Sequence, residues 1–202
     1  MDTTQLYVFD EGYRNKAPLL CGVDEAGRGP LCGPVAIGAV ILDPQNPVEG
    51  LNDSKKLSEK KRKILYEQIV EKAVAWKVIL MSAREIDGMN IRQAVLEGMR
   101  QAVAGLETTP NLVLVDGNDP PEFACPCMAV VKGDATSASI AAASIMAKVT
   151  RDRLMCELDK QYPEYMLAKH KGYPTKQHYE IIDKLGLQDF YRFTYLKKWS
   201  NR

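Results

Sequence analysis

One stretch, Gly22-Val23-Asp24-Glu25-Ala26-Gly27-Arg28-Gly29-Pro30, constrains this chain more than any other feature. An apolar run from Leu19 to Val23 predicts a buried strand, and two carboxylates follow it directly. Burying carboxylates beside a core strand costs free energy unless a cation or hydrogen bonds compensate. The Gly-Arg-Gly turn behind them lets a ligand approach the backbone closely. The stretch therefore predicts an acidic pocket with one guanidinium, which suits divalent metal and phosphate chemistry.

Composition indicates a globular protein and excludes several other classes. With 202 residues, 46% hydrophobic and 26% charged, the chain fits one domain. The polar first 16 residues do not resemble a signal peptide, and the longest apolar run is too short to span a bilayer. Five irregularly placed cysteines are typical of reduced thiols, so we expect a cytoplasmic protein without disulfides. A net charge of +1 means that any nucleic-acid binding must use a local patch.

Strand and helix patterns alternate along the chain. The Gly-Arg-Gly-Pro turn joins the first two strand patterns, which predicts an antiparallel pair. The later alternation of helices and strands predicts an α/β class with a mixed sheet. We expect strands over 19–24, 35–42, 75–81 and 112–115, and helices that begin after Ser58, after Asn90 and at Ser137, with a short last one near 175–185.

Acidic residues fall at the ends of these elements. Asp24 and Glu25 close the first strand, and Asp116 closes the strand 112–115. Asp134 precedes the long helix, and spacing alone does not choose between it and Asp152 as a fourth member. Side chains alternate along a strand, so Asp24 and Glu25 converge only if the strand ends there. Such a group predicts a site for Mg²⁺ or Mn²⁺, although Asp116-Gly117 by itself is also typical of a simple turn.

Several cations, hydroxyls and one aromatic ring are candidates for nucleic-acid contacts. Ser144, Lys148 and Arg151 share one face of the predicted long helix, an arrangement that also describes a solvated helix face. Lys55 opens the segment 55–63, which sets six cations against one acid. Tyr173 lies in a Gly/Pro turn, where a ring can stack on a sugar or base or can simply pack.

Two other groups show no pattern that predicts chemistry. Cys125 and Cys127 lack a second pair of ligands, which argues against zinc. His170 and His178 have no catalytic partner at a recognisable spacing.

Taken together and in this order, these residues resemble ribonuclease HII of the bacterial type. The resemblance covers nearly the whole chain. It implies a ribonuclease H-like fold, a central mixed sheet flanked by helices, within a single domain 1–202 of which about 160–202 is a C-terminal helical extension. The blocks that carry it are 22–30, 51–58, 115–118, 132–134, 143–152 and 170–175.

The resemblance also assigns the site residues. It implies four carboxylates that bind metal and catalyse, with Asp134 rather than Asp152 in the fourth place: Asp24, Glu25, Asp116 and Asp134. Gly27, Arg28 and Gly29 would read the ribose 2′-hydroxyl, and Tyr173 would lie against the deoxyribose beyond the scissile phosphate. Further phosphate contacts would come from Lys55, Ser144, Lys148 and Arg151.

The implied activity is endonucleolytic hydrolysis with Mg²⁺ or Mn²⁺. The substrates would be the RNA strand of RNA–DNA hybrids and duplex DNA that contains ribonucleotides, cut on the 5′ side of the ribonucleotide to leave 5′-phosphate and 3′-hydroxyl ends. We expect a monomer without membrane contact. Two alternatives are another metal-dependent nuclease, such as a 3′–5′ exonuclease, and a hybrid-binding module without catalysis.

The C-terminal segment departs from the family pattern. The bacterial pattern has an Arg-x-Ser-Phe-x-Pro-like stretch, whereas this chain reads Arg192-Phe193-Thr194-Tyr195-Leu196-Lys197. The arginine and a hydroxyl followed by an aromatic ring are present, and the proline is not.

Overall fold

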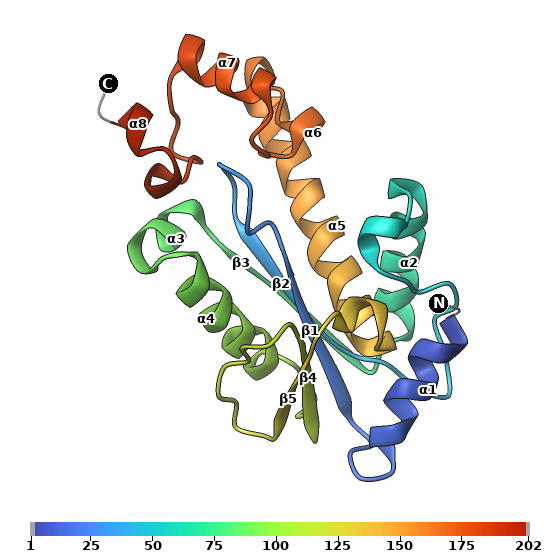
Figure 1. Ribbon diagram of the computed structural model, residues 1–202. Coiled ribbons are helices and arrows are strands. Elements are labelled where there is room, and N and C mark those ends of the chain that lie inside the picture. The colour runs from blue at the N-terminus through green and yellow to red at the C-terminus, as the bar shows by residue number, and fades with distance from the viewer. Residues whose placement is uncertain (1–2, 201–202) are drawn as a thin grey trace.

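A computed structural model describes residues 3–200 and shows a five-stranded mixed sheet (Figure 1). The strand order is β3-β2-β1-β4-β5, in which β1 pairs antiparallel with β2 and parallel with β4. The predicted antiparallel pair and mixed sheet are therefore confirmed. β5 was not predicted, because it is short and begins at the second cysteine of a Cys-Pro-Cys segment. The strands are β1 Leu20–Ala26, β2 Val35–Ile41, β3 Ala75–Met81, β4 Leu112–Asp116 and β5 Cys127–Val130.

Helices surround this sheet. Three of the predicted helix starts are confirmed, since the side chains of Ser58, Asn90 and Ser137 cap α2, α4 and α5. The helices are α1 Thr3–Arg14, α2 Glu59–Lys72, α3 Ala83–Met89, α4 Ile91–Ala104, α5 Ala138–Gln161, α6 Leu167–His170, α7 Lys176–Leu185 and α8 Lys197–Ser200. Short 3₁₀ turns complete the chain: η1 Ser54–Lys56, η2 Gly133–Ala135, η3 Pro163–Tyr165 and η4 Phe193–Tyr195.

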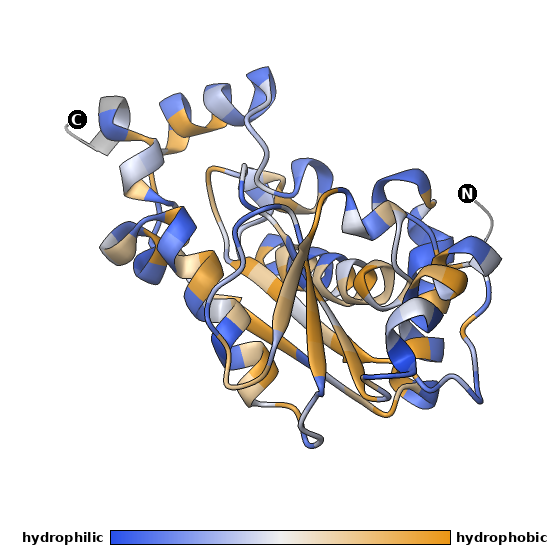
Figure 2. Cartoon of the chain, turned by 60° about the horizontal axis from the view of Figure 1, so that its bottom comes forward, coloured by the Kyte–Doolittle hydropathy of each residue, from blue (hydrophilic) through white to orange (hydrophobic). Residues whose placement is uncertain are grey.

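Hydrophobic cores lie on both faces of the sheet, and Figure 2 shows the hydrophobic residues along its strands. On one face, α3 and α4 pack against residues such as Val23 and Ile37. On the other face, α1, α2 and the first half of α5 pack against residues such as Val40 and Leu42. None of the helices within residues 3–200 is long and apolar enough to cross a membrane.

The first strand is longer than the sequence pattern predicted. It was expected to end at Asp24, but β1 continues to Ala26, which pairs with Ala36 of β2. The ladder with β2 overrides the local glycine signal. Because side chains alternate on a regular strand, Glu25 lies on the same face as Val23, towards α4, and Asp24 lies on the opposite face, towards α5. The two carboxylates therefore do not converge through an end of the strand.

The C-terminal helices gather beyond the turn that joins β1 and β2 (Figure 1). Leu31 and Cys32 of that turn are buried in a cluster with Tyr165 and Tyr191. The helical character expected for residues after about 160 is confirmed. The ends of the predicted domain, residues 1–2 and 201–202, lie outside the described part of the chain.

Close contact between α5 and the sheet depends on two glycines. A Cβ atom on Gly22 would lie 2.1 Å from the Ser139 carbonyl carbon, and one on Gly38 would lie 2.4 Å from the Ala143 oxygen. Both obstacles are backbone atoms that a side-chain rotation cannot remove. These two positions therefore determine how near the helix lies to β1 and β2.

We predict that Gly38→Ala lowers the free energy of unfolding by about 1–3 kcal/mol, because the added methyl group overpacks this contact. Urea denaturation of the purified variant measures the change. Gly12→Ala is the matched control: it lies in α1 with no atom within 4 Å of the added Cβ, so it should leave stability unchanged or raise it by about 0.5–1 kcal/mol. Equal stability of Gly38→Ala and wild type would contradict the prediction.

Candidate active site

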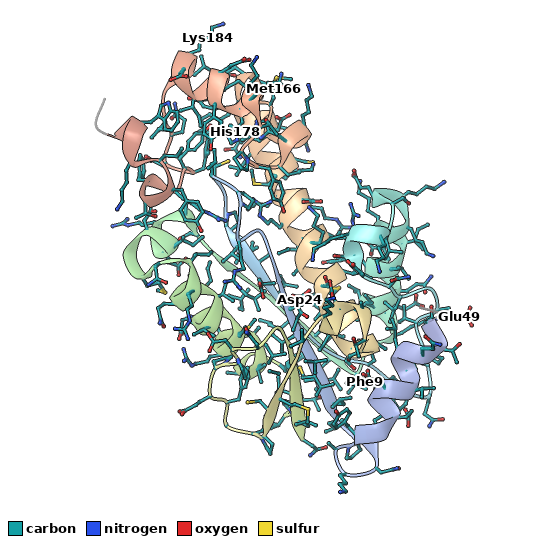
Figure 3. The ribbon with its side chains drawn as sticks, viewed as in Figure 1. Phe9, Asp24, Glu49, Met166, His178 and Lys184 are labelled. Atoms are coloured by element: carbon teal, nitrogen blue, oxygen red, sulfur yellow. The ribbon has the colours of Figure 1, made fainter. Side chains whose placement is uncertain are left out.

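Three aspartates lie together on the α5 face of the sheet. Val23 of β1 pairs with Val115 of β4, so Asp24 and Asp116 are the next residues on two adjacent parallel strands. The Asp116 Oδ1 atom accepts a hydrogen bond of 2.6 Å from the Gly133 N–H, which ties η2 to the end of β4. The following residue, Asp134, is thereby brought close enough for its charge to interact with that of Asp116. Figure 3 shows Asp24 where β1 meets α5.

Glu25 reaches the same region from the α4 face. β4 ends at Asp116, which is level with Asp24 of β1. Beyond this point no residue of β4 lies beside Glu25, so the Glu25 side chain can approach Asp116. Both residues line one small cleft of about 130 Å³ together with Arg28 and residues of α4. The structure therefore places four carboxylates around the end of β4, with Glu25 approaching from the other side of the sheet.

Burial and mutual repulsion raise the pKa values of three of these carboxyls. Burial is the main cause for Asp24, whose pKa is raised well above 3.8, and the charges of Glu25 and Asp116 add to it. Burial also raises the pKa of Glu25, although the guanidinium of Arg28, 3.2 Å away, opposes it. For Asp134, burial and then Asp116 raise the pKa while Lys55 opposes. The site therefore carries more negative charge than its two cations relieve.

The donor set fits a divalent metal, but the side chains do not enclose one as they stand. Within residues 3–200, no group of three or more His, Cys, Asp or Glu side chains is arranged to hold an ion directly. The opposite faces of Asp24 and Glu25 explain part of this, and the Lys55 ammonium lies 3.6 Å from Asp134 Oδ2. Carboxylate oxygens are the ligands that Mg²⁺ and Mn²⁺ prefer. A divalent ion would relieve the repulsion that raises these pKa values.

The Gly27–Gly29 turn combines a constrained residue with an open one. Gly27 has φ +99°, and a Cβ there would lie 2.2 Å from the Arg151 side chain. Gly29 is exposed and a Cβ there would meet no atom within 4 Å. Arg28 between them pairs with Glu25. Gly27 thus shapes the turn, whereas Gly29 leaves free space beside the carboxylates.

Tyr173 lies on a second turn that contacts the segment after Gly29. The Leu31 N–H donates to the Gly172 oxygen at 2.8 Å, and Tyr173 itself is 42% exposed. The Lys148 ammonium lies 5.9 Å from the centre of the tyrosine ring. The ring is therefore available to a ligand on the same side of the molecule as the Gly27–Gly29 turn.

The remaining phosphate candidates have different environments. Ser144 is buried, with its hydroxyl 2.9 Å from that of Ser54, and it lies close enough to Asp24 to oppose the rise in the pKa of that carboxyl. Lys148 donates to Asp152 at 2.8 Å. Asp152 lines a separate cleft between α2 and α5. The Lys55 ammonium is largely exposed beside Asp134.

Arg151 is not available to a phosphate. It is completely buried, and its guanidinium donates to the carbonyls of Pro34, Lys171 and Cys32 at 2.9–3.1 Å. The prediction of a direct phosphate contact is wrong for this residue, because helical spacing places it on a face but does not show what covers that face.

One residue beside the site was not assigned from the sequence. Arg192 is buried and donates to the carbonyls of Gly27, Arg28 and Gly33. The only signal was its place in the C-terminal segment that partly matches the family pattern.

Comparison with known proteins identifies the family. A sequence model described as Ribonuclease HII matches residues 21–201. A Ribonuclease HII from Aliivibrio fischeri (strain MJ11) is 56% identical over 181 residues, which cover 90% of this chain and 86% of that protein. The chain belongs to the ribonuclease HII family. It is therefore a metal-dependent endoribonuclease that cleaves RNA in RNA–DNA hybrids and at ribonucleotides embedded in DNA.

Solved structures agree with this fold. Ribonuclease H2 from Pyrococcus horikoshii OT3 is similar with a TM-score of 0.74 and 29% identity, covering 87% of this chain and 92% of that one. A structure of Bst-RNase HIII in complex with Mn²⁺ has a TM-score of 0.70 at 18% identity and covers 91% of this chain and 70% of that one, which shows the shared ribonuclease H-like fold alone. Family membership leaves the exonuclease and the non-catalytic module without support.

We predict that Asp24→Asn raises the melting temperature of the metal-free protein by a few degrees at pH 7 in EDTA. The folded-state pKa of Asp24 lies above its ordinary value of 3.8, so ionisation costs the folded state stability as pH rises through that range. The gain should disappear below about pH 4, where the carboxyl is protonated in both states. Differential scanning fluorimetry measures it, with the exposed Glu71→Gln as control. A lower melting temperature for Asp24→Asn at pH 7 would contradict the argument.

Proposed function

We propose that Asp24, Glu25, Asp116 and Asp134 hold Mg²⁺ or Mn²⁺ and catalyse hydrolysis on the 5′ side of a ribonucleotide, leaving 5′-phosphate and 3′-hydroxyl ends. The observation that carries this proposal is the excess of buried carboxylate charge at the end of β4. Two bound ions would supply Lewis-acid activation of the attacking water and of the leaving oxygen. No histidine is needed as a base, and both histidines lie in the C-terminal part of the chain.

The residues of this chain would keep the carboxylates ready for that chemistry. The Glu25 N–H donates to Asp24 Oδ1 at 2.7 Å, and the Gly133 N–H donates to Asp116 Oδ1 at 2.6 Å. These bonds restrict the carboxylate rotamers before any ligand arrives. Lys55 and Arg28 would approach the phosphate once the ions neutralise Asp134 and Glu25, since both cations have exposed side chains.

The proposal gives ribonucleotide recognition to the Gly27–Gly29 turn and Tyr173. Backbone amides without a Cβ in the way can contact a 2′-hydroxyl, which is the group that distinguishes RNA from DNA. The partly exposed Tyr173 ring would lie against the next deoxyribose. Reading a ribose and then a deoxyribose would select RNA–DNA junctions within a duplex. Lys148, beside the Tyr173 ring, would add a phosphate contact.

We also propose that one chain is the active unit, as a single domain 1–202 with about 160–202 as its extension, and that it works in the cytoplasm. The C-terminal helices share a core with the turn after β1, which supports a single domain. Each of the five cysteines is free, which fits a reducing compartment. Light scattering after size exclusion tests the monomer.

We predict a metal-dependent cut immediately 5′ of one ribonucleotide in a covalently closed circular DNA duplex. The circle has no free end, so an exonuclease cannot act on it. Asp116→Asn should reduce the cleavage rate by at least about 10³-fold, because it removes one negative charge yet can still accept from Gly133. Single-nucleotide mapping of the products measures both. Full activity of Asp116→Asn, or cleavage in EDTA, would contradict the proposal.

A second prediction concerns Gly29. Gly29→Ala should leave the melting temperature unchanged, because the added Cβ meets no protein atom. It should lower kcat/KM on the single-ribonucleotide duplex by about tenfold, since the methyl group stands where the ribose must approach. Gly27→Ala provides the contrast, because φ +99° and the Arg151 contact predict a loss of stability. A wild-type kcat/KM for Gly29→Ala would show that ribose does not bind at this backbone.

A further inference from the structure

The Arg192 guanidinium donates hydrogen bonds to the backbone of the turn that follows β1. Its Nη2 donates to Gly27 O at 2.7 Å, its Nη1 to Arg28 O at 2.9 Å and its Nε to Gly33 O at 3.0 Å. The side chain is 0% exposed. Three carbonyls separated by up to six residues of chain thus share one planar group, whose fork geometry fixes their relative positions.

These bonds determine which way the amides of the turn point. No cis peptide occurs within the described residues, and in a trans peptide the N–H points opposite to the C=O of the same unit. When Arg192 draws the carbonyls of Gly27 and Arg28 inward, the N–H groups of Arg28 and Gly29 must therefore point outward. Among residues 3–200, no protein group accepts from these two amides. They remain free to donate to a ligand.

Arg192 has further partners that strengthen its hold on the turn, but no carboxylate within residues 3–200 forms a salt bridge with it. Its guanidinium lies 5.3 Å from the centre of the Tyr195 ring, and the Tyr195 hydroxyl donates to the same Arg28 carbonyl at 3.0 Å. Burying a guanidinium without a carboxylate is costly. Hydrogen bonds to the three carbonyl oxygens offset that cost, and of these oxygens only that of Arg28 has a second side-chain donor among residues 3–200.

The adjacent residue connects this turn to Tyr173. The Tyr191 hydroxyl lies 3.0 Å from His178 Nε2, and His178 Nδ1 lies 2.9 Å from the Tyr173 carbonyl oxygen. The carbonyl can only accept, so Nδ1 carries the proton and Nε2 accepts from the hydroxyl. His178 lies in the C-terminal part of the molecule, at the turn end of the sheet (Figure 3). Of two consecutive residues, Arg192 therefore contacts the Gly27–Gly29 turn directly, and Tyr191 is linked to the Tyr173 turn through His178.

We propose that Arg192 is a positioning residue that orients the Arg28 and Gly29 amides towards the substrate, and that Tyr191 and Arg192 together set the spacing between these amides and Tyr173. This spacing determines how strictly the enzyme selects a ribose followed by a deoxyribose. The inference rests on the proposed roles of the Gly27–Gly29 turn and Tyr173. It gives the C-terminal segment, which departs from the family pattern, a direct part in specificity.

The test uses the full chain and a strand with several ribonucleotides followed by DNA, paired with DNA. Arg192→Met removes all three donors, and Arg192→Lys keeps the charge but loses the planar fork. Products are mapped to single nucleotides to give the fraction of cuts 5′ of the last ribonucleotide. This fraction is independent of the amount of folded enzyme, so a loss of stability alone cannot change it.

Two further variants keep the test decisive. Arg14→Met is the matched control: Arg14 is also buried and donates to two carbonyls, but it lies at the end of α1, next to the start of β1. Tyr195→Phe removes only the hydroxyl that contacts Arg28 and replaces the Arg192 variants if they do not fold. Circular dichroism at the assay temperature shows whether each variant is folded.

We expect Arg192→Met to spread the cuts over neighbouring ribonucleotides and to lower kcat/KM at the junction by about tenfold. Arg192→Lys should have smaller effects on the cleavage positions and on kcat/KM, and Tyr195→Phe should have the smallest. Arg14→Met should change neither. Wild-type cleavage positions in folded Arg192→Met, or in Tyr195→Phe if the former does not fold, overturn the inference. Failure of the wild type itself to cut 5′ of a ribonucleotide would instead reject the proposed function.

Discussion

The close packing of α5 against β1 and β2 is the contact on which the rest of the structure depends. Gly22 and Gly38 present bare backbone to the helix, so that its Ala- and Ser-rich first half lies directly on the sheet. This approach brings Ser144 close to Asp24, whose pKa it lowers. It also places η2, immediately before the helix, beside the end of β4. A larger residue at either glycine would move the helix and the carboxylate network together.

The site that this packing creates is electrostatically unfavourable in the absence of cations. Burial raises the pKa values of Asp24, Glu25 and Asp134, and the charges of neighbouring carboxylates add to the effect. The hydrophobic cores around the site must therefore offset the free-energy cost of burying these carboxylates. A protein optimised only for stability would replace these residues by amides or apolar side chains. Under the proposed function, bound cations would relieve this repulsion, which would account for these carboxylates in β1, at the end of β4 and in η2.

The two buried arginines show how the turns proposed to recognise the substrate are held together, although they come from distant segments. Arg151 of α5 binds carbonyls of Cys32, Pro34 and Lys171, and Arg192 binds those of Gly27, Arg28 and Gly33. Neither residue is free to touch substrate. Both donate to the backbone of the loop after β1, which a β-bridge between Cys32 and Tyr191 also holds. Long-range bonds from side chains and backbone thus take the place of a regular ladder in this loop.

The sequence by itself determined the class of fold, most of the strands, the helices that Ser58, Asn90 and Ser137 cap, and the carboxylates that make up the candidate site. Periodicity and local chemistry are enough for the elements and for Asp24, Glu25 and Asp116, whereas the choice of Asp134 over Asp152 came from the resemblance to the family. Only the tertiary structure decided that β1 continues past Asp24, that Glu25 comes from the opposite face of the sheet, and that Arg151 is buried. Each of these depends on what another segment does. β2 extends the ladder of β1, β4 ends level with Asp24, and the loop after β1 and Lys171 cover Arg151. Such pairings are long-range, and a pattern of neighbouring residues does not contain them.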